Sequence, residues 1–554
     1  MADIFAKEKR KMNSYKKMLI IAIIQWFITT ILQMDRLFFT YKSETGYMLV
    51  TKIAYLFLLM VGWCFVENVR INIKAGNKSY KRGMEIFLFY FVIMMLLLLI
   101  LWPGTWSLDD IQVLKSIDKY KKWGAWQHFL SGLYLAVLLQ ILPFPGGAIL
   151  LQNVLVSICV AVVVTKLEII YDLKRIKIGW VDKLVKVFPF LLPPVLMHQF
   201  SGYRMGLYIY LELVMIVFLI EAIKCKKQWS IGYTFLFGFL AVMVSTWRTE
   251  SFLYAPGVCL LVIFMDKDVL FVKRKVMTLL LIVIGFFGIN KFQNWSLGNS
   301  NYKVISLITP STALVRAADT SLDAELLKNI DKVTKLKVIY ENPAMSGTEM
   351  YWSTDVIRKG YTADDYENYV AAVVKLSLKY PEIVVKERTD MFKSGMSGLA
   401  YSNVMSSASL FDKGNDSTTA VIFQKKNWLI KRPVFEKIRK HFIYVLGMKK
   451  WDGKENRLLQ MIIWNSFVPT IGLLCAWVIT LCKKQWKIAL IVSMIIIKIP
   501  IIWLTEPSPW SMYLLTFYLL GYVYLVYGIY KFFMRRNINE SGDKQTFENH
   551  ASIV

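Results

Sequence analysis

The chain has 554 residues, of which 56% are hydrophobic, and its mean hydropathy is +0.44. Its formal net charge is +28. In a soluble protein this charge would indicate nucleic-acid binding, but here most Lys and Arg residues flank apolar segments of membrane-spanning length. The composition therefore argues against a nucleic-acid partner and predicts an all-α polytopic membrane protein that resides in the lipid bilayer.

Twelve apolar segments have about the length that a hydrocarbon core of roughly 30 Å requires. The N-terminal segment has no small-residue cleavage site, so we expect a retained first helix and not a removed signal peptide. We predict membrane spans, in chain order, at 18–34, 47–66, 84–102, 146–166, 185–200, 205–223, 230–247, 252–266, 276–290, 460–481, 487–504 and 510–530.

The apolar segment 128–142 is shorter than these spans. At a rise of 1.5 Å per residue it covers only about 22 Å, and Pro143 and Pro145 end the run. If it were a span, the following loops would change sides of the membrane, and basic loops would then lie on the outer side. We therefore expect a helix that lies at the membrane interface.

Basic residues fall mainly on one side of the predicted membrane. The loops on the side of the N-terminus contain 30 Lys and Arg residues, and the short loops on the opposite side contain 8. The positive-inside rule then places both termini in the cytoplasm of a multi-pass protein of the cell (plasma) membrane. Residues 103–145 become a first large outer loop with interfacial helices.

The same topology predicts three regions. Residues 1–290 form an N-terminal transmembrane module with the outer loop 103–145, residues 291–458 form a mainly helical extracytoplasmic domain, and residues 459–554 form the last transmembrane helices and a cytoplasmic tail. No cysteine lies in 291–458, so disulfides do not hold that domain together.

Two adjacent acids, Asp109 and Asp110, follow the third predicted span in the stretch from Trp102 to Asp110. They stand at the start of a short helix with regularly spaced apolar residues. One interpretation is structural, because Ser107 and Asp110 have the spacing of a capping box and acids are favoured in a first helical turn. The other is catalytic: an ionised carboxylate accepts a proton from a hydroxyl, or binds a divalent cation such as Mg or Mn that steadies a phosphate leaving group.

This Pro-Gly…Ser-x-Asp stretch, followed by Trp126-Gln127-His128 at the start of a short helix, resembles the first outer loop of the GT-C superfamily of integral-membrane glycosyltransferases, in particular its bacterial multi-span members. The resemblance implies transfer of a sugar from a polyprenyl-phosphate-linked donor to an extracytoplasmic acceptor, which would be a cell-envelope glycan, lipid or protein. The catalytic acid of that loop corresponds to Asp109, with Asp110 as the second acid. Members commonly have Glu at the second position, so both carboxylates stay candidates.

Other outer turns carry groups suited to the same reaction. His198 and Arg204 lie in one turn and could bind a lipid phosphate; the alternative is an interfacial anchor. Arg248 and Glu250 lie in the next turn. They could bind the phosphate and the sugar hydroxyl groups, or form only a local ion pair. We predict donor phosphate binding by His198, Arg204 and Arg248.

His128 and Glu506 complete the predicted substrate-binding set with Glu250. GT-C members often carry an Arg-Tyr pair near the last outer turn, where this chain has Met512-Tyr513, so no phosphate-binding arginine is expected there. Inside the predicted spans, Glu212 and Lys498 are expected to form a structural ion pair across the bundle.

Three other functions compete with glycosyl transfer. A transporter or flippase of lipid-linked saccharides predicts repeated halves and polar groups near the membrane midplane, and neither is visible in the sequence. A polysaccharide polymerase or ligase would use the same carriers and is expected to have arginine-rich outer loops. A non-catalytic assembly scaffold would tolerate Asp109→Asn.

Overall fold

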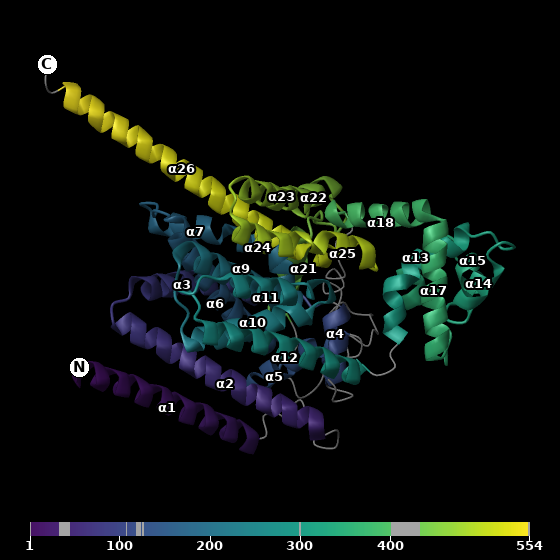
Figure 1. Ribbon diagram of the computed structural model, residues 1–554, viewed down its shortest axis with the longest axis horizontal. Coiled ribbons are helices and arrows are strands. Elements are labelled where there is room, and N and C mark those ends of the chain that lie inside the picture. The colour runs from purple at the N-terminus through teal and green to yellow at the C-terminus, as the bar shows by residue number, and fades with distance from the viewer. Residues whose placement is uncertain are drawn as a thin grey trace.

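The protein is described here from a computed structural model, which covers residues 2–32, 45–106, 108–117, 123, 127–297, 301–399 and 433–551. Every regular element in these ranges is a helix, and the extended pairings are two isolated bridges, Thr334 with Ile357 and Lys449 with Glu455. The predicted all-α class is therefore confirmed for the described part of the chain (Figure 1).

Most helices form one elongated bundle. Eight of them are long and apolar enough to cross a membrane, and these eight coincide with predicted spans, so the expectation of a multi-pass membrane protein is confirmed at this level. They lie within α1 (Ala2–Ile31), α2 (Thr45–Lys74), α3 (Lys78–Leu101), α6 (Pro145–Tyr171), α9 (Met205–Cys225), the consecutive helices α22 (Arg457–Ile463) and α23 (Phe467–Cys482), the consecutive helices α24 (Trp486–Ile496) and α25 (Lys498–Thr505), and α26 (Leu515–Ala551).

The other four predicted spans are not among these eight and stay predictions. Segment 230–247 coincides with α10 (Ile231–Trp247), segment 252–266 with the shorter α11 (Tyr254–Phe264), and segment 276–290 lies within α12 (Val272–Leu297). Segment 185–200 is broken into the end of α7 (Gly179–Val187), the 3-10 turn η3 (Phe188–Leu191) and α8 (Pro193–Gln199). Its prolines explain the breaks, because proline lacks the backbone N–H and clashes with the preceding turn.

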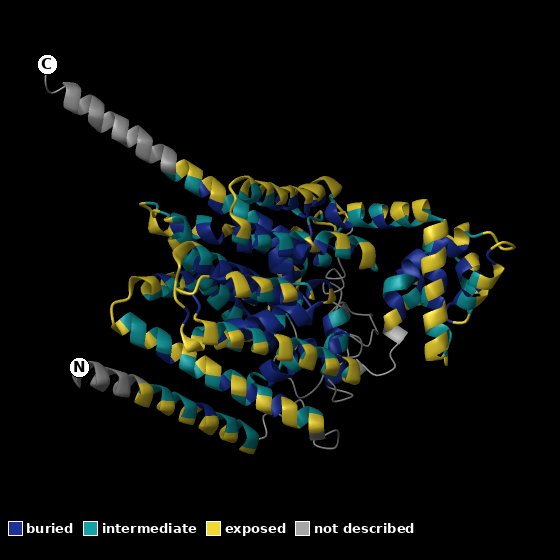
Figure 2. Ribbon diagram, viewed as in Figure 1, coloured by how far each residue is buried: buried dark blue, intermediate teal, exposed yellow. Residues whose placement is uncertain are grey.

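The short segment 128–142 forms α5 (Phe129–Ile141), which packs against α2 and α6. Its residues 129–132 and 135–140 are buried. The helix is therefore surrounded mainly by protein, and its position at the membrane interface stays a prediction. In Figure 2, buried residues lie inside the bundle and exposed residues lie on the outer helices. Many of these exposed residues are apolar.

A separate set of helices lies at one end of the bundle and has its own hydrophobic core (Figure 1). We call it the distal domain, residues 304–380. Its helices are α13 (Ile305–Ala317), α14 (Ala324–Asp331), α15 (Leu336–Glu341), α16 (Gly347–Ser353) and α17 (Ala363–Lys379). A capping box between Thr362 and Asp365 begins α17.

α18 (Pro381–Met396) connects the distal domain to the bundle, and a further helix of this region, α21 (Glu436–Leu446), belongs to the bundle itself. α18 starts at the distal domain, and α21 packs against α3 and α8. Met396, Ile443 and Leu446 belong to the core of the bundle. The part of 291–458 with an independent core is therefore shorter than the whole region.

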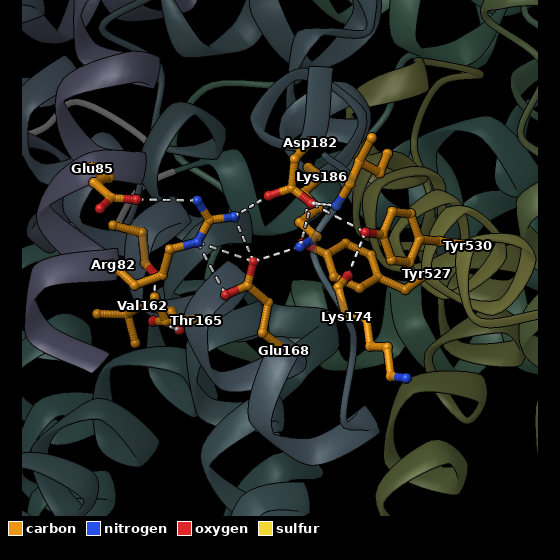
Figure 3. A network of polar contacts seen from close by, with 12 residues as sticks. Arg82, Glu85, Val162, Thr165, Glu168, Lys174, Asp182, Lys186, Tyr527 and Tyr530 are labelled. Carbon is orange, nitrogen blue, oxygen red and sulfur yellow. Dashed lines mark hydrogen bonds and ion pairs between the residues drawn. The ribbon is translucent and has the colours of Figure 1, made fainter. Parts of the chain in front are cut away.

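The end of the bundle far from the distal domain is closed by a buried ionic network (Figure 3). Arg82 of α3 pairs with Glu168 of α6 at 2.7 Å and with Asp182 of α7. Lys186 lies 2.7 Å from Glu168 and 2.8 Å from Asp182, and Tyr530 of α26 donates a hydrogen bond to Asp182 over 3.1 Å. Two cations balance two anions, so the network ties four helices together without a net buried charge.

Arg82 and the end of α3 at Leu101 are separated by about 28 Å along the helix axis at 1.5 Å per residue, close to the thickness of a hydrocarbon core. We call the two ends of the bundle the Arg82 end and the Asp109 end. The start of α1 and the exit of α26 lie at the side opposite the distal domain (Figure 1). Between the ends, Lys498 Nζ lies 3.0 Å from Glu212 Oε1, so the predicted intramembrane ion pair is confirmed.

Candidate active site

The backbone that follows α3 is fixed against the turn that follows α8. Thr105 donates its backbone N–H to the carbonyl of Phe200 over 2.8 Å and its hydroxyl to the carbonyl of Met197 over 2.6 Å. Gly104 has φ +120°, and a Cβ there would lie 2.6 Å from the oxygen of Phe200. Only glycine fits this conformation and this close approach. The first turn of α4 (Leu108–Lys115) is thereby placed beside residues 198–204.

The two adjacent acids have different surroundings. Asp110 is 1% exposed and accepts a hydrogen bond from the Ser201 hydroxyl over 2.6 Å. Asp109 is partly exposed, and burial raises its pKa to about 6, while the nearby Arg204 acts in the opposite direction. The capping role considered for Ser107 lies outside the described residues. Asp110 is thus held by a distant partner, whereas Asp109 is the more accessible carboxylate and titrates near neutrality.

Arg248 and Glu250 form the ion pair that the sequence left open as an alternative. Arg248 Nε donates to Glu250 Oε1, and its Nη1 lies 2.8 Å from the sulfur of Met205. Burial disfavours the charged form of Glu250, but Arg248 overcomes it and holds the pKa of Glu250 below its usual range. Nη2 of Arg248 is buried and has no hydrogen-bond partner. One edge of the guanidinium is therefore open to a further acceptor.

Arg204 lies just before α9, close enough to act electrostatically on both Asp109 and His128. His128 is the N-cap of α5, and its Nδ1 accepts the N–H of Leu130 over 3.4 Å. Burial, with a smaller effect of Arg204, lowers the pKa of His128 to about 3, so its ring is neutral at pH 7. Its Nε2 and the Nε of Arg204 have no hydrogen-bond partner.

His198 has a more enclosed position. It is 1% exposed, its Nδ1 lies 2.9 Å from the carbonyl oxygen of Pro194, and its ring centroid lies 6.4 Å from that of Trp464. This packing suits a residue that holds the turn, and direct phosphate binding by His198 stays a prediction.

Glu506 lies where α18 approaches the last turn at this end. It is 2% exposed, and neither carboxyl oxygen has a hydrogen-bond partner. Burial and, to a smaller extent, the nearby Glu250 raise the pKa of Glu506 to about 9, although Arg388, the backbone N–H of Trp510 and Arg248 oppose the shift. The carboxyl group is therefore neutral at pH 7.

Two arginines that the sequence patterns did not indicate contribute to this end of the bundle. Arg388 of α18 donates to the carbonyl of Glu506 over 2.6 Å, and Arg439 of α21 donates to the carbonyls of Leu101 and Gly104 over 3.2 and 2.8 Å. Both are fully buried. Nothing in the sequence distinguishes them from the many other basic residues of 291–458.

The predicted residues form one connected set. Tyr203 lies close enough to interact electrostatically with Arg204, Asp109, Arg248 and Glu250, and the last two also act on Glu506. The set contains several buried N–H groups without an acceptor in the described residues: Gln127 Nε2, His128 Nε2, Arg204 Nε, Arg248 Nη2 and Arg388 Nη2. Such groups are rare in folded proteins, because each costs free energy until an acceptor arrives. The arrangement can bind an anion or a polyol beside an accessible carboxylate.

No group of three or more His, Cys, Asp or Glu side chains within the described ranges is arranged to hold a metal ion. Comparison with protein families, curated proteins and solved structures finds no match to this chain. The functional assignment therefore depends on the residues of the site and their chemistry.

Proposed function

We propose that this protein is a glycosyltransferase of the GT-C type, which transfers a sugar from a polyprenyl-phosphate-linked donor to a cell-envelope acceptor outside the cytoplasm. The observation that carries the proposal is the group of unpaired buried N–H donors around Arg204 and Arg248, next to the accessible Asp109. An anionic donor with a polar sugar supplies the missing acceptors, and a long apolar carrier suits a site at the end of membrane-spanning helices.

The proposed reaction is a single displacement at the anomeric carbon. Asp109 accepts the proton of the acceptor hydroxyl while the acceptor oxygen forms a bond to the anomeric carbon. The bond from that carbon to the phosphate oxygen breaks, and its electron pair leaves with the polyprenyl phosphate. Arg204 and Arg248 offset the charge that develops on the phosphate. The configuration at the anomeric carbon is inverted.

The orientation in the membrane is part of the proposal. The Arg82 end would face the cytoplasm, because the predicted loops at that end carry most of the basic residues. The start of α1 and the exit of α26 lie on that side, opposite the distal domain (Figure 1). The Asp109 end and the distal domain would then lie outside a plasma membrane.

The test measures transfer of radiolabelled sugar from defined polyprenyl-phosphate donors in membranes that contain the wild type, Asp109→Asn or a control. Asp364→Asn is a matched control, because Asp364 is an exposed acid at the start of α17. We expect transfer by the wild type and the control, and a loss of at least about 100-fold in Asp109→Asn, the usual scale for removing a general base.

The same assay separates the competing functions. Addition of one sugar per acceptor supports the proposal, whereas transfer of a preassembled saccharide block indicates a polymerase or ligase. Movement of the donor across sealed vesicles without a new glycosidic bond indicates a flippase. Unchanged turnover in Asp109→Asn would remove this carboxylate from the mechanism. The need for a divalent cation is tested separately, by measuring transfer after addition of a chelator and again after Mg or Mn is restored.

A further inference from the structure

The last turn of the bundle at the Asp109 end, residues 504–510, is covered by α18 and by the distal domain. Arg388 Nη1 lies 2.6 Å from the carbonyl oxygen of Glu506. Trp503 donates to the Thr389 hydroxyl over 3.3 Å, and Thr309 donates to the carbonyl of Pro507 over 3.2 Å. The contacts of Arg388 and Thr309 hold the turn through its backbone, and none of the three contacts uses the carboxyl group of Glu506.

Four buried polar atoms around this turn have no hydrogen-bond partner among the residues that the structure describes: both carboxyl oxygens of Glu506, Nη2 of Arg388 and the hydroxyl oxygen of Ser511. Arg388 and Glu506 are close enough for the guanidinium to act on the carboxyl electrostatically, but no hydrogen bond joins the two side chains. Arg388 Nε instead pairs with Glu387 at 2.6 Å. A guanidinium and a carboxyl group that are buried close together yet share no hydrogen bond point to a missing ligand group, because direct pairing would otherwise satisfy both.

The carboxyl group of Glu506 lies close to a glycine of α18, Gly395. A Cβ at position 395 of α18 would lie 3.4 Å from Glu506 Oε1, 3.3 Å from a methyl group of Leu514 and 3.5 Å from the carbonyl carbon of Pro509. Gly395 therefore lets α18 approach the turn while leaving the carboxyl without a side-chain neighbour at that position.

The chemistry of the unpaired atoms selects the ligand class. Arg388 Nη2 is a donor only, a carboxyl that is neutral at pH 7 has both a donor and an acceptor, and the Ser511 hydroxyl also does both. A sugar hydroxyl accepts from one neighbour and donates to another, so adjacent hydroxyl groups satisfy the whole set. A phosphate would use the donors but leave the acceptor oxygen of Glu506 without a partner.

We propose that Arg388, Glu506 and Ser511 form a subsite for hydroxyl groups of the transferred sugar, which α18 and the last turn of the bundle build together. This inference rests on the proposed function for the identity of the substrate. Glu506 lies within electrostatic range of Arg248, so a sugar whose phosphate binds Arg248 is placed with its hydroxyl groups toward the subsite. Arg388 and Glu506 are then specificity-determining residues that act on the donor.

The test compares Glu506→Gln, Glu506→Leu and Arg388→Gln with the wild type, using the polyprenyl-phosphate donor that is transferred and its series of monodeoxy sugar analogues. Glu382→Leu is the matched control, since Glu382 is an exposed acid on the same helix. In the wild type, removal of the hydroxyl that contacts the subsite should raise the donor KM about 10-fold or more, the cost of leaving buried polar groups unpaired.

In Glu506→Leu the same deoxy analogue should bind as well as the complete donor, so that the 10-fold discrimination disappears. Glu506→Gln, which resembles the neutral acid, should keep most of the discrimination. Equal discrimination in the wild type, Glu506→Leu and Arg388→Gln would overturn the subsite, provided that thermal unfolding shows both variants folded. If Glu506→Leu does not fold, Arg388→Gln decides the result: lost discrimination supports the subsite, and discrimination equal to that of the wild type overturns it.

A binding measurement separates this inference from the proposed function. Titration of the purified protein with hexose 1-phosphates reports on the subsite without turnover. If no donor is transferred but wild-type binding is weakened about 10-fold in Arg388→Gln, the enzyme assignment fails and the subsite stands. If sugar is transferred, but the discrimination against the deoxy analogue and the binding of hexose 1-phosphates are the same in every variant, the subsite fails and the enzyme assignment stands.

Discussion

The Ser201 hydroxyl donates a hydrogen bond to Asp110 over 2.6 Å, and this contact distinguishes Asp110 from the adjacent Asp109. Ser201 also accepts the backbone N–H of Tyr203 over 3.1 Å. Asp110 therefore fixes α4 to the turn that precedes Arg204, while Asp109 keeps an accessible carboxylate on the same helical turn. In the proposed reaction, this contact favours a positioning role for Asp110 and proton transfer by Asp109.

Ser201→Ala should lower stability more than it lowers turnover. It removes a hydrogen-bond donor from a buried carboxyl group, at a cost of about 1–3 kcal/mol. We expect a lower Tm of the purified protein and a modest loss of kcat, in contrast to the loss of at least about 100-fold expected for Asp109→Asn. A collapse of turnover in Ser201→Ala with an unchanged Tm would place Asp110, and not Asp109, at the reaction centre.

The activity should depend on pH through Asp109. Its raised pKa of about 6 means that the carboxyl group carries a proton below pH 6 and cannot accept one from the acceptor. The value of kcat/KM should therefore rise with pH through about 6 and level off above it, because this ratio reports on the free enzyme. The same raised pKa stabilises the fold on the acid side, since the folded state binds the proton more tightly than the unfolded state. A flat profile between pH 5 and 8 would contradict the assignment.

Arg204→Gln should move the rise of kcat/KM with pH to higher pH values. Arg204 opposes the rise in the pKa of Asp109, so removing its charge lets burial act alone. The donor KM should also rise, because one proposed phosphate contact is lost. The matched measurement is Arg316→Gln, which neutralises an exposed arginine of the distal domain and should shift neither quantity. A shift of the rise in kcat/KM to lower pH in Arg204→Gln would show that Arg204 does not act on Asp109.

Arg82→Gln should destabilise the fold by about 3–5 kcal/mol, because Lys186 then remains as one cation for the two anions Glu168 and Asp182, and one buried negative charge is left uncompensated. We expect a large fall in Tm in detergent. Lys337→Gln is the control, since Lys337 and Glu341 form an exposed pair at 3.7 Å and such pairs contribute about 0–1 kcal/mol. A double variant with Asp182→Asn measures the coupling, and additive effects of the two changes would exclude a shared network.

Labelling of single cysteines in intact cells tests the orientation. In a chain whose native cysteines are replaced, Cys at position 319 of the distal domain should react with an impermeant reagent from outside, whereas Cys at position 177 near the Arg82 end should react only after permeabilisation. Both positions are exposed. If position 177 were labelled from outside and position 319 were not, the orientation in the membrane would be the opposite of the proposed one. The basis for an external donor site would then be lost.

The all-α class and the multi-pass character of the protein could be predicted from the sequence alone. Run length and hydropathy are local properties, so eight of the twelve predicted spans coincide with helices long and apolar enough to cross a membrane. The same local chemistry singled out Asp109, Arg204, Arg248 and Glu250, because acids and arginines in short turns between apolar runs are conspicuous. The Lys and Arg residues of the loops could also be counted along the chain, and their bias predicted the orientation in the membrane.

The tertiary structure decided which of these groups meet and what each one contacts. The partner of Asp110 is Ser201, 91 residues later, and the partners of Arg439 lie more than 300 residues away. Likewise, α5 is enclosed by α2 and α6, although its length and composition suited an interfacial helix. Contacts of this kind depend on how helices pack, and packing depends on side-chain volumes summed over the whole bundle. Short stretches of sequence contain only the part of that information that is local.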